Sequence, residues 1–160
     1  INMPAQGNHL KARIFNNTIY NSANNTLFEI SNFGYDVELV EFYNNVLFVI
    51  NPGAGYATSG DSGGLINITS NNNIWYGSSS GLPSFTGAND RSVDPMLVNS
   101  SAADFTLQSP SPAIDTGSSL VASVVTKDFD GNLRSNGGGY DIGAYEFIGN
   151  SKKQDNKKNK

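Results

Sequence analysis

Few side chains of this sequence combine a type and a spacing that could carry out a reaction. Three carboxylates, Asp36, Glu38 and Glu41, form an acidic cluster just before an Asn-Asn pair at Asn44. Paired carboxylates act as acid and base in glycoside hydrolases, but a solvated strand face explains this cluster equally well and is the interpretation we favour. His9 is the only histidine, and a lone histidine near the start of a chain is more often incidental than catalytic.

A polysaccharide lyase needs a strongly basic residue beside a cation or carboxylate. Before the C-terminal tail the chain offers five cations, namely Lys11, Arg13, Arg91, Lys127 and Arg134. None lies in a motif typical of a lyase, and the sequence has no Cys/His pair or phosphate-binding loop. The sequence therefore identifies no catalytic residue and leaves open whether the protein is an enzyme.

One segment resembles the start of a calcium-binding loop, because Asp128, Asp130 and Asn132 alternate with other residues. The EF-hand interpretation fails, however. Gly131 stands at the fourth position of the loop instead of the sixth, and the twelfth position is Gly139 instead of Glu. We expect no cofactor, with Ca²⁺ at this segment as the alternative.

A structural role for the same acidic residues is the favoured interpretation. Asp128 or Asp141 would pair with Arg134 and tie the last segment over the open end of the domain. Covering an open strand edge matters because such an edge promotes aggregation.

The elements that must position these side chains are indicated by a repeat. Residues 15–20, 43–48 and 71–76 read FNNTIY, YNNVLF and NNNIWY, and successive copies stand 28 residues apart. Self-similarity at a fixed period is typical of architectures in which each unit stacks only on its neighbours. Each unit here joins short β-prone runs at an Asn-Asn corner, and no apolar stripe of helical period persists. The repeat predicts a solenoid of strands and turns.

Alternation along the predicted strands assigns an inside, an outside and a corner. Two columns are expected inside, with Trp75 at the end of the stack: Ile14, Phe42 and Ser70, and Ile19, Leu47 and Trp75. One column is expected at the corner, where Asn tolerates the left-handed backbone and stacked amides can bond to each other: Asn17, Asn45 and Asn73. We interpret the corner column as scaffold rather than as a ligand-binding row.

The outward aromatic side chains are the candidate carbohydrate-binding residues. They form two columns beside the corner: Phe15 and Tyr43, and Tyr20, Phe48 and Tyr76. Rings in neighbouring strands, about 4.8 Å apart, could stack on successive sugars of a glycan. The alternative, which we favour, is that the rings pack on one another or under a loop.

The composition fits a turn-rich β domain. The chain has 160 residues, 17 glycines and no cysteine, and none of its apolar runs approaches the roughly 20 residues that span a bilayer. Residues 1–149 carry 5 basic and 13 acidic residues, hence a formal charge of -8. Because such a body repels nucleic acid, we expect no nucleic-acid partner. The short apolar runs predict no membrane span, and we expect a monomer.

Composition also divides the chain into three parts. We expect parallel coils in residues 1–93, a last coil and capping segment in 94–149, and a disordered Lys/Asn-rich tail in 150–160. The chain starts at Ile1 without an initiator Met, and we expect a fragment or a processed product whose earlier coils are missing.

Four motifs follow one another in the C-terminal part: residues 94–95 (DP), 111–117 (SPAIDTG), 128–134 (DFDGNLR) and 141–147 (DIGAYEF). In this order they resemble the C-terminal segment of bacterial right-handed parallel β-helix proteins, which share the pectate-lyase-like (pectin lyase) fold and often carry a choice-of-anchor C-terminal region. The resemblance covers residues 13–147 and implies an all-β fold, a right-handed parallel β-helix.

The same resemblance implies a secreted or surface-attached bacterial protein that binds or acts on polysaccharide. The group includes polysaccharide lyases, glycoside hydrolases and adhesin-like surface proteins, and a shared fold does not settle function. We expect this segment to be mainly structural, with any active site on earlier coils. The competing hypothesis is a non-catalytic surface adhesin or spacer, and a third is a trimeric phage-like tail component.

Overall fold

Strands make up most of the regular structure in the described part of the chain. The computed structural model describes residues 10–21, 27–31, 37–60 and 66–149. Within these ranges it contains ten strands, two short 3₁₀ helices and no α-helix. The protein is therefore all-β, as the sequence predicted. None of the helices in these ranges is long and apolar enough to cross a membrane.

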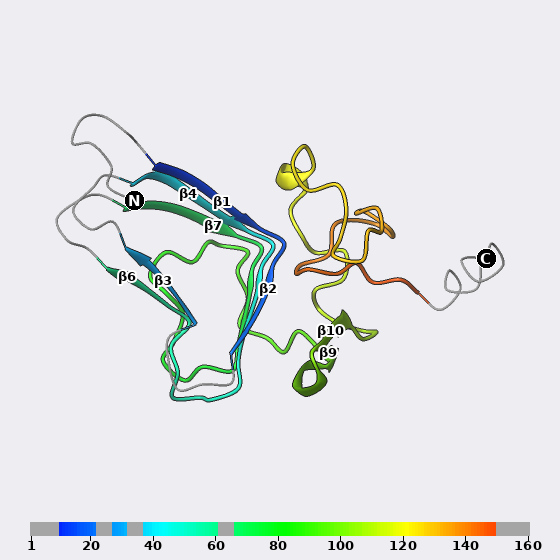
Figure 1. Ribbon diagram of the computed structural model, residues 1–160, viewed down its shortest axis with the longest axis horizontal. Coiled ribbons are helices and arrows are strands. Elements are labelled where there is room, and N and C mark those ends of the chain that lie inside the picture. The colour runs from blue at the N-terminus through cyan, green and yellow to red at the C-terminus, as the bar shows by residue number, and fades with distance from the viewer. Residues whose placement is uncertain (1–9, 22–26, 32–36, 61–65, 150–160) are drawn as a thin grey trace.

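The first eight strands form three parallel sheets that the chain visits in turn (Figure 1). The first sheet has the order β1 (Leu10–Phe15), β4 (Val37–Tyr43) and β7 (Ile66–Asn71). The second has the order β2 (Thr18–Asn21), β5 (Val46–Val49) and β8 (Ile74–Tyr76). The third pairs β3 (Phe28–Ser31) with β6 (Ala57–Gly60).

The register of the first two sheets follows the 28-residue repeat. In the first sheet Ile14 pairs with Phe42 and Phe42 pairs with Ser70. In the second sheet the corresponding pairs join Ile19 to Leu47 and Leu47 to Trp75. Both columns predicted from the sequence are therefore confirmed as neighbours in parallel sheets.

The inner faces of the sheets enclose an aromatic core. Phe42, Leu47 and Trp75 are fully buried and pack with Tyr56 and Ala54 from the connection after the second sheet. The Phe42 and Trp75 rings stack at 5.7 Å, and Tyr56 meets Trp75 edge to face at 5.4 Å. The second sheet thus contributes its alternate side chains to this core and turns the others outward.

The C-terminal segment, residues 94–149, covers the outer face of that second sheet. It contains the antiparallel pair β9 (Leu97–Asn99) and β10 (Asp104–Leu107), and the 3₁₀ helices η1 (Ser100–Ala102) and η2 (Ser119–Val121). Val46 and Ile74 point outward and are fully buried against this segment, in a cluster that is completed by four of its side chains: Leu97, Leu107, Ala113 and Ile142.

This position differs from the expected cap over the end of the stack. The segment lies alongside the corner between the first and second sheets (Figure 1). The outward residues of the second sheet explain the difference. Val46 and Ile74 are apolar. More of their surface is removed from water when the segment lies on this face than when it lies on the end of the stack.

Candidate functional site

Each Asn-Asn pair makes a sharp corner between a strand of the first sheet and a strand of the second. The first Asn of each pair has the left-handed backbone, with φ of 52° at Asn16, 58° at Asn44 and 55° at Asn72. The sequence predicted this backbone at the second Asn of each pair, and that prediction is wrong by one residue. The physical reason given for Asn holds, because Asn enters the left-handed region more readily than other non-Gly residues.

The second Asn of each pair forms a hydrogen-bonded ladder. Both the backbone N–H and the Nδ2 of Asn17 donate to Oδ1 of Asn45, each at 3.0 Å. Asn45 donates to Oδ1 of Asn73 in the same way, at 2.8 and 3.0 Å. The Nδ2 groups also reach across to the carbonyls of Ile14 and Phe42. The predicted amide ladder is thus confirmed, and its bonds from one Asn side chain to the next all run in one direction.

The ladder ends on a carboxylate that the sequence analysis did not identify. The Oδ1 of Asp90 accepts from the backbone N–H and the Nδ2 of Asn73, at 2.8 and 2.9 Å. Its Oδ2 accepts from the Ser70 hydroxyl at 2.6 Å and the Gly87 N–H at 3.1 Å. The last rung needs only acceptors, which suits Asp. Asp90 follows Asn73 by 17 residues instead of 28, so a search at the fixed period misses it.

The first Asn of each pair holds the C-terminal segment with its side chain. Asn16 donates to the carbonyls of Asp141 and Gly143, at 3.0 and 3.4 Å. Asn44 exchanges two hydrogen bonds with the backbone of Ser118, and the Asn72 Nδ2 donates to the carbonyl of Thr116 at 3.0 Å. One Asn of each pair therefore supports the stack, and the other fixes the segment beside it.

Arg134 forms the buried ion pair of the C-terminal segment. Its NH1 lies 3.0 Å from Oε1 of Glu146, and both side chains are almost completely buried. Asp128 or Asp141 was the partner predicted from the sequence, and that prediction is wrong. Arg134 instead donates to the backbone carbonyl of Asp141, and also to those of Lys127, Gly143 and Ala144.

Asp128 accepts hydrogen bonds from its own turn. Its Oδ1 accepts from the Asn132 N–H at 2.8 Å, and its Oδ2 accepts from the Asn132 side chain and the Glu146 N–H, each at 3.0 Å. These bonds occupy both carboxylate oxygens of the residue considered for calcium. In the described residues no three or more acidic, His or Cys side chains gather in a way that could hold a metal ion.

Asp141 is the described carboxyl whose acidity changes most. Burial raises the pKa of Asp141 to about 6, against hydrogen bonds from the Asp115 and Phe147 N–H groups, which lower it. The nearby Glu146 and Asp115 carboxylates raise it further. Since Asp141 accepts two backbone N–H groups from distant parts of the segment, it serves as a structural link.

One of the two aromatic columns contacts the C-terminal segment. Tyr20, Phe48 and Tyr76 meet edge to face, with ring centroids 5.4 and 5.0 Å apart. Phe105 of β10 lies 5.3 Å from Tyr20, and Phe48 packs against the outer apolar cluster. This column therefore mainly joins the second sheet to the C-terminal segment.

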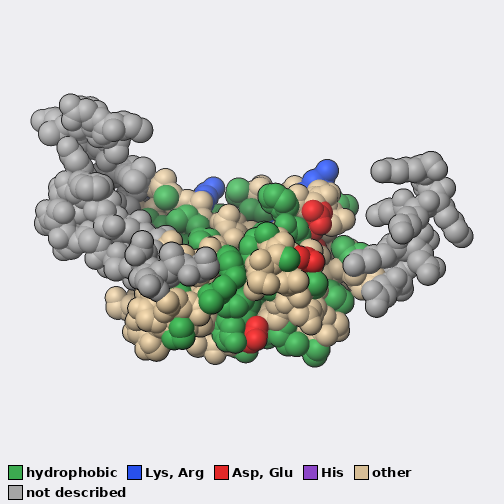
Figure 2. Space-filling model, turned by 60° about the horizontal axis from the view of Figure 1, so that its bottom comes forward, with side chains coloured by type: hydrophobic (Ala, Val, Ile, Leu, Met, Phe, Trp, Pro, Cys, Tyr) green, Lys and Arg blue, Asp and Glu red, His purple; other side chains and the backbone are tan. Residues whose placement is uncertain are grey.

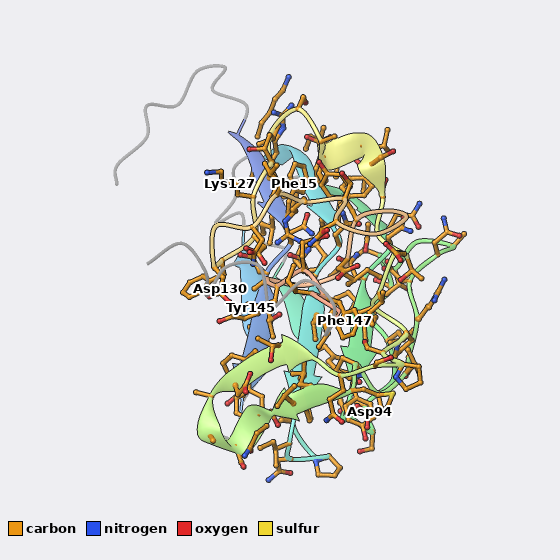
Figure 3. All side chains as sticks on the ribbon, turned by 90° about the vertical axis from the view of Figure 1, so that its right-hand side faces the viewer. Phe15, Asp94, Lys127, Asp130, Tyr145 and Phe147 are labelled. Carbon is orange, nitrogen blue, oxygen red and sulfur yellow. The ribbon has the colours of Figure 1, made fainter. Side chains whose placement is uncertain are left out.

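The other aromatic column lies on the outer face of the first sheet. Phe15 and Tyr43 are partly exposed and meet edge to face at 5.8 Å. Beside them Arg13 and Glu41 form an ion pair at 2.8 Å, which accounts for one member of the acidic cluster. On β7, exposed Thr69 pairs with Glu41 and so continues the row that Arg13 and Glu41 form. Figure 3 labels Phe15 in a view from the side on which the C-terminal segment lies.

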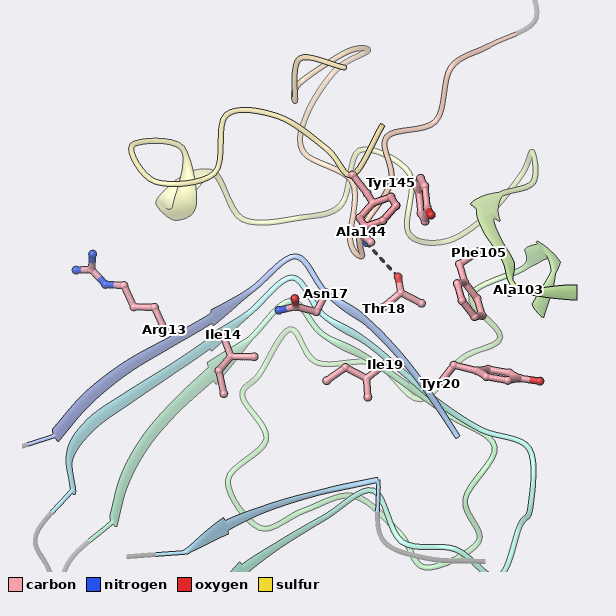
Figure 4. A pocket seen from close by; sticks show the side chains of 11 residues that line it. Arg13, Ile14, Asn17, Thr18, Ile19, Tyr20, Ala103, Phe105, Ala144 and Tyr145 are labelled. Carbon is pink, nitrogen blue, oxygen red and sulfur yellow. Dashed lines mark hydrogen bonds between the residues drawn. The ribbon is translucent and has the colours of Figure 1, made fainter. Parts of the chain in front are cut away.

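A cleft of about 920 Å³ opens at the edge of β1 and β2. Its floor comes from the first repeat unit, including Ile14, Asn17 and Ile19, and its wall comes from the C-terminal segment (Figure 4). The wall carries Phe105 of β10 and Tyr145, whose ring lies 5.5 Å from that of Phe129.

The remaining candidates give no catalytic constellation within the described ranges. His9 and Asp36 lie outside the described residues. On the face in Figure 2 the charged side chains are few and scattered among apolar and uncharged polar ones. Comparison of the chain with protein-family models, curated proteins and solved structures finds no match.

Proposed function

We propose that the described strands are consecutive coils of a right-handed parallel β-helix. Three features support the proposal: parallel pairing at a 28-residue interval, repeated visits to the same sheets, and an amide ladder through the corners. Right-handedness is the expectation for parallel strands joined by crossover connections. The C-terminal motifs, which resemble those of secreted or surface-attached bacterial β-helix proteins, support the same proposal.

The function we propose is polysaccharide binding by a surface or extracellular protein in which this segment is mainly scaffold. The supporting observation is the partly exposed pair of Phe15 and Tyr43 beside the Arg13–Glu41 ion pair. Rings flanked by groups that form hydrogen bonds suit a sugar, which presents C–H surfaces and hydroxyls. Burial and the neighbouring Glu41 raise the pKa of Tyr43, so its phenol stays protonated at neutral pH and remains a hydrogen-bond donor.

A surface spacer or adhesin without glycan binding is the second candidate. The hydrogen bonds of the corners favour this candidate. The three ladder residues and Asp90 form them with other parts of the same chain rather than with a ligand. Catalysis is assigned to none of the described residues under either candidate.

Affinity electrophoresis separates these candidates. The chain is run through gels that contain neutral or uronate-containing polysaccharides, and the expected result is retardation in at least one of them. Tyr43→Ala should reduce that retardation several-fold. Tyr76→Ala is the matched control, because it removes an aromatic ring from the column that contacts the C-terminal segment.

Two results would count against glycan binding at this face. Mobility that no polysaccharide changes favours the spacer. If retardation is lost in Tyr76→Ala and kept in a folded Tyr43→Ala, the glycan binds at the column of Tyr20, Phe48 and Tyr76 instead. Circular dichroism of each variant confirms that it is folded before its mobility is compared.

A further inference from the structure

The interior of the stack is incompletely covered at the edge formed by β1 and β2. Phe42 and Leu47, in the second repeat unit, are fully buried. Ile14 and Ile19 occupy the same columns in the first unit, yet each is only partly buried. The difference arises because the second unit has a neighbour on both sides. The exposed part of Ile14 and Ile19 is therefore interior surface that another unit would cover.

The ladder is also open at this edge. Each Oδ1 farther along accepts a backbone N–H and an Nδ2 from the preceding corner, as Asn45 does from Asn17. No described residue donates to the Oδ1 of Asn17, whose own amide donates to the Phe15 carbonyl and to Asn45. The first rung thus presents an acceptor in the register of the repeat.

The cleft at this edge has an aromatic wall beside the first unit. Phe105, Phe129 and Tyr145 line it, and Phe129 is 78 % exposed. Figure 4 shows Phe105 and Tyr145 on the C-terminal side of the cleft, with Ile14 and Ile19 beneath the strands. In the units farther along, the same segment packs on outward apolar side chains such as Val46 and Ile74. The wall offers equivalent apolar surface to one more unit.

We propose that this edge binds one further strand–Asn-Asn–strand unit of the 28-residue repeat. Its corner Asn donates its backbone N–H and Nδ2 to the Oδ1 of Asn17, and its inner side chains cover Ile14 and Ile19. A second copy of the chain is a poor occupant, because the far end of its ladder is Asp90. That carboxylate accepts from Asn73 and has no side-chain N–H to donate.

An inserted repeat tests the proposal in the full chain. A copy of residues 38–65 is placed between His9 and Leu10, which puts the copied Asn45 28 residues before Asn17. The expected result is a rise in Tm of about 5 °C, since an added repeat contributes its interface with the neighbouring repeat.

Amide hydrogen exchange gives a local readout of the same insertion. The N–H of Val46 donates to the Asn17 carbonyl, and that of Ile74 donates to the Asn45 carbonyl. The equivalent N–H of the first unit belongs to Thr18, so its exchange should slow at least tenfold in the insertion protein. The matched control is the same insertion with the substitution Asn45→Asp made in the inserted copy only. It keeps the shape but loses the Nδ2 donor, and most of the gain in Tm should disappear.

Three outcomes would overturn the proposal. The first is an insertion that folds and leaves both Tm and Thr18 exchange unchanged. The second is a glycan in the cleft, seen as oligosaccharide-induced shifts of Tyr145 and Phe129 resonances that persist when the repeat is inserted. The third is concentration-dependent dimerisation of the unmodified chain that Asn17→Asp abolishes, which would identify a second copy as the occupant.

Discussion

Single polar residues in this protein mostly bind backbone groups of the same chain. Arg134 illustrates the pattern, because its guanidinium pairs with Glu146 and also donates to four backbone carbonyls. Asp128 and Asp141 use their carboxylates in the same way. An irregular segment such as 94–149 leaves many N–H and C=O groups outside strand pairing, and these side chains satisfy them.

Removing the guanidinium of Arg134 should destabilise the protein strongly. Arg134→Ala leaves the Glu146 carboxylate buried without its partner, and the expected loss is about 3–5 kcal/mol in the free energy of unfolding. Urea denaturation measures the loss. Arg13→Ala is the control, since Arg13 is 61 % exposed in its pair with Glu41 and should lose less than about 1 kcal/mol. Similar small losses in both variants would contradict the structural role of Arg134.

Asp141 should make stability fall as pH rises through the weakly acidic range. Its pKa in the folded protein is about 6, raised from 3.8 chiefly by burial, so the folded state binds the proton more tightly than the unfolded state. Its contribution is therefore fully present below about pH 4, declines as pH rises towards 6, and then levels off.

A carboxyl titration by NMR should place the midpoint of Asp141 near pH 6. In urea denaturation, the stability of the wild type relative to Asp141→Asn should be higher at pH 4 than at pH 7. A midpoint below pH 4 would show that the hydrogen bonds from the Asp115 and Phe147 N–H groups outweigh burial.

At the scale of the elements, the Asn-Asn corners fix the register of two sheets. A strand with one buried face resists a slip of one residue, and the ladder adds a polar constraint at every corner. Asn45 takes part in bonds to the corner on each side and to the Ile14 carbonyl. The corner is thus both a turn and a register marker.

Replacing a middle rung should cost more than replacing an exposed Asn of the same sheet. Asn45→Ala removes the side-chain acceptor of the Asn17 N–H groups and the Nδ2 donor to the Ile14 carbonyl and the Asn73 Oδ1, while the backbone N–H of residue 45 still donates to Asn73. Losing these bonds should cost at least about 2 kcal/mol of stability. Asn67→Ala, at an exposed position of β7, should change stability by less than about 0.5 kcal/mol. Thermal and urea denaturation of both variants give the comparison, and equal effects would refute the structural ladder.

The repeated elements were predictable from the sequence because their constraints recur. Alternation placed Phe42 and Leu47 inside, and the 28-residue period paired them with the right neighbours. Asp90 was not predictable in this way, because it follows Asn73 by 17 residues instead of 28. The Glu146 partner of Arg134 was missed for a related reason. Asp128, Asp130, Asp141 and Glu146 all lie within 12 residues of Arg134 in the sequence, and only the three-dimensional path of an irregular segment selects one of them.

At the scale of the whole molecule, the second sheet joins two apolar cores. Leu47 and Trp75 point into the inner core, while Val46 and Ile74 point into the outer one. The side chains of Asn16, Asn44 and Asn72 bond the C-terminal segment to three successive corners. The described parts should therefore unfold together, although the motifs of the C-terminal segment alone did not predict where it packs.

A cavity in the outer core should lower the stability of the inner core as well. Ile142 is fully buried in the outer cluster, and Ile142→Ala should reduce Tm by about 5 °C or more. Circular dichroism should show a single shifted transition, and amide exchange should speed up in β4 as well as in β9. Leu133→Ala, at a residue 69 % exposed, should leave Tm almost unchanged. Faster exchange confined to residues 94–149 would show that the two parts unfold separately.

Trp75 gives this protein a built-in optical probe. It is the single tryptophan of the chain, it is fully buried between Phe42, Tyr56 and Phe85, and its indole N–H finds no acceptor among the described residues. An indole fully buried among aromatic rings should emit at the blue end of the tryptophan range and resist quenching by iodide. Its emission colour therefore reports on the packing between repeat units without any added label.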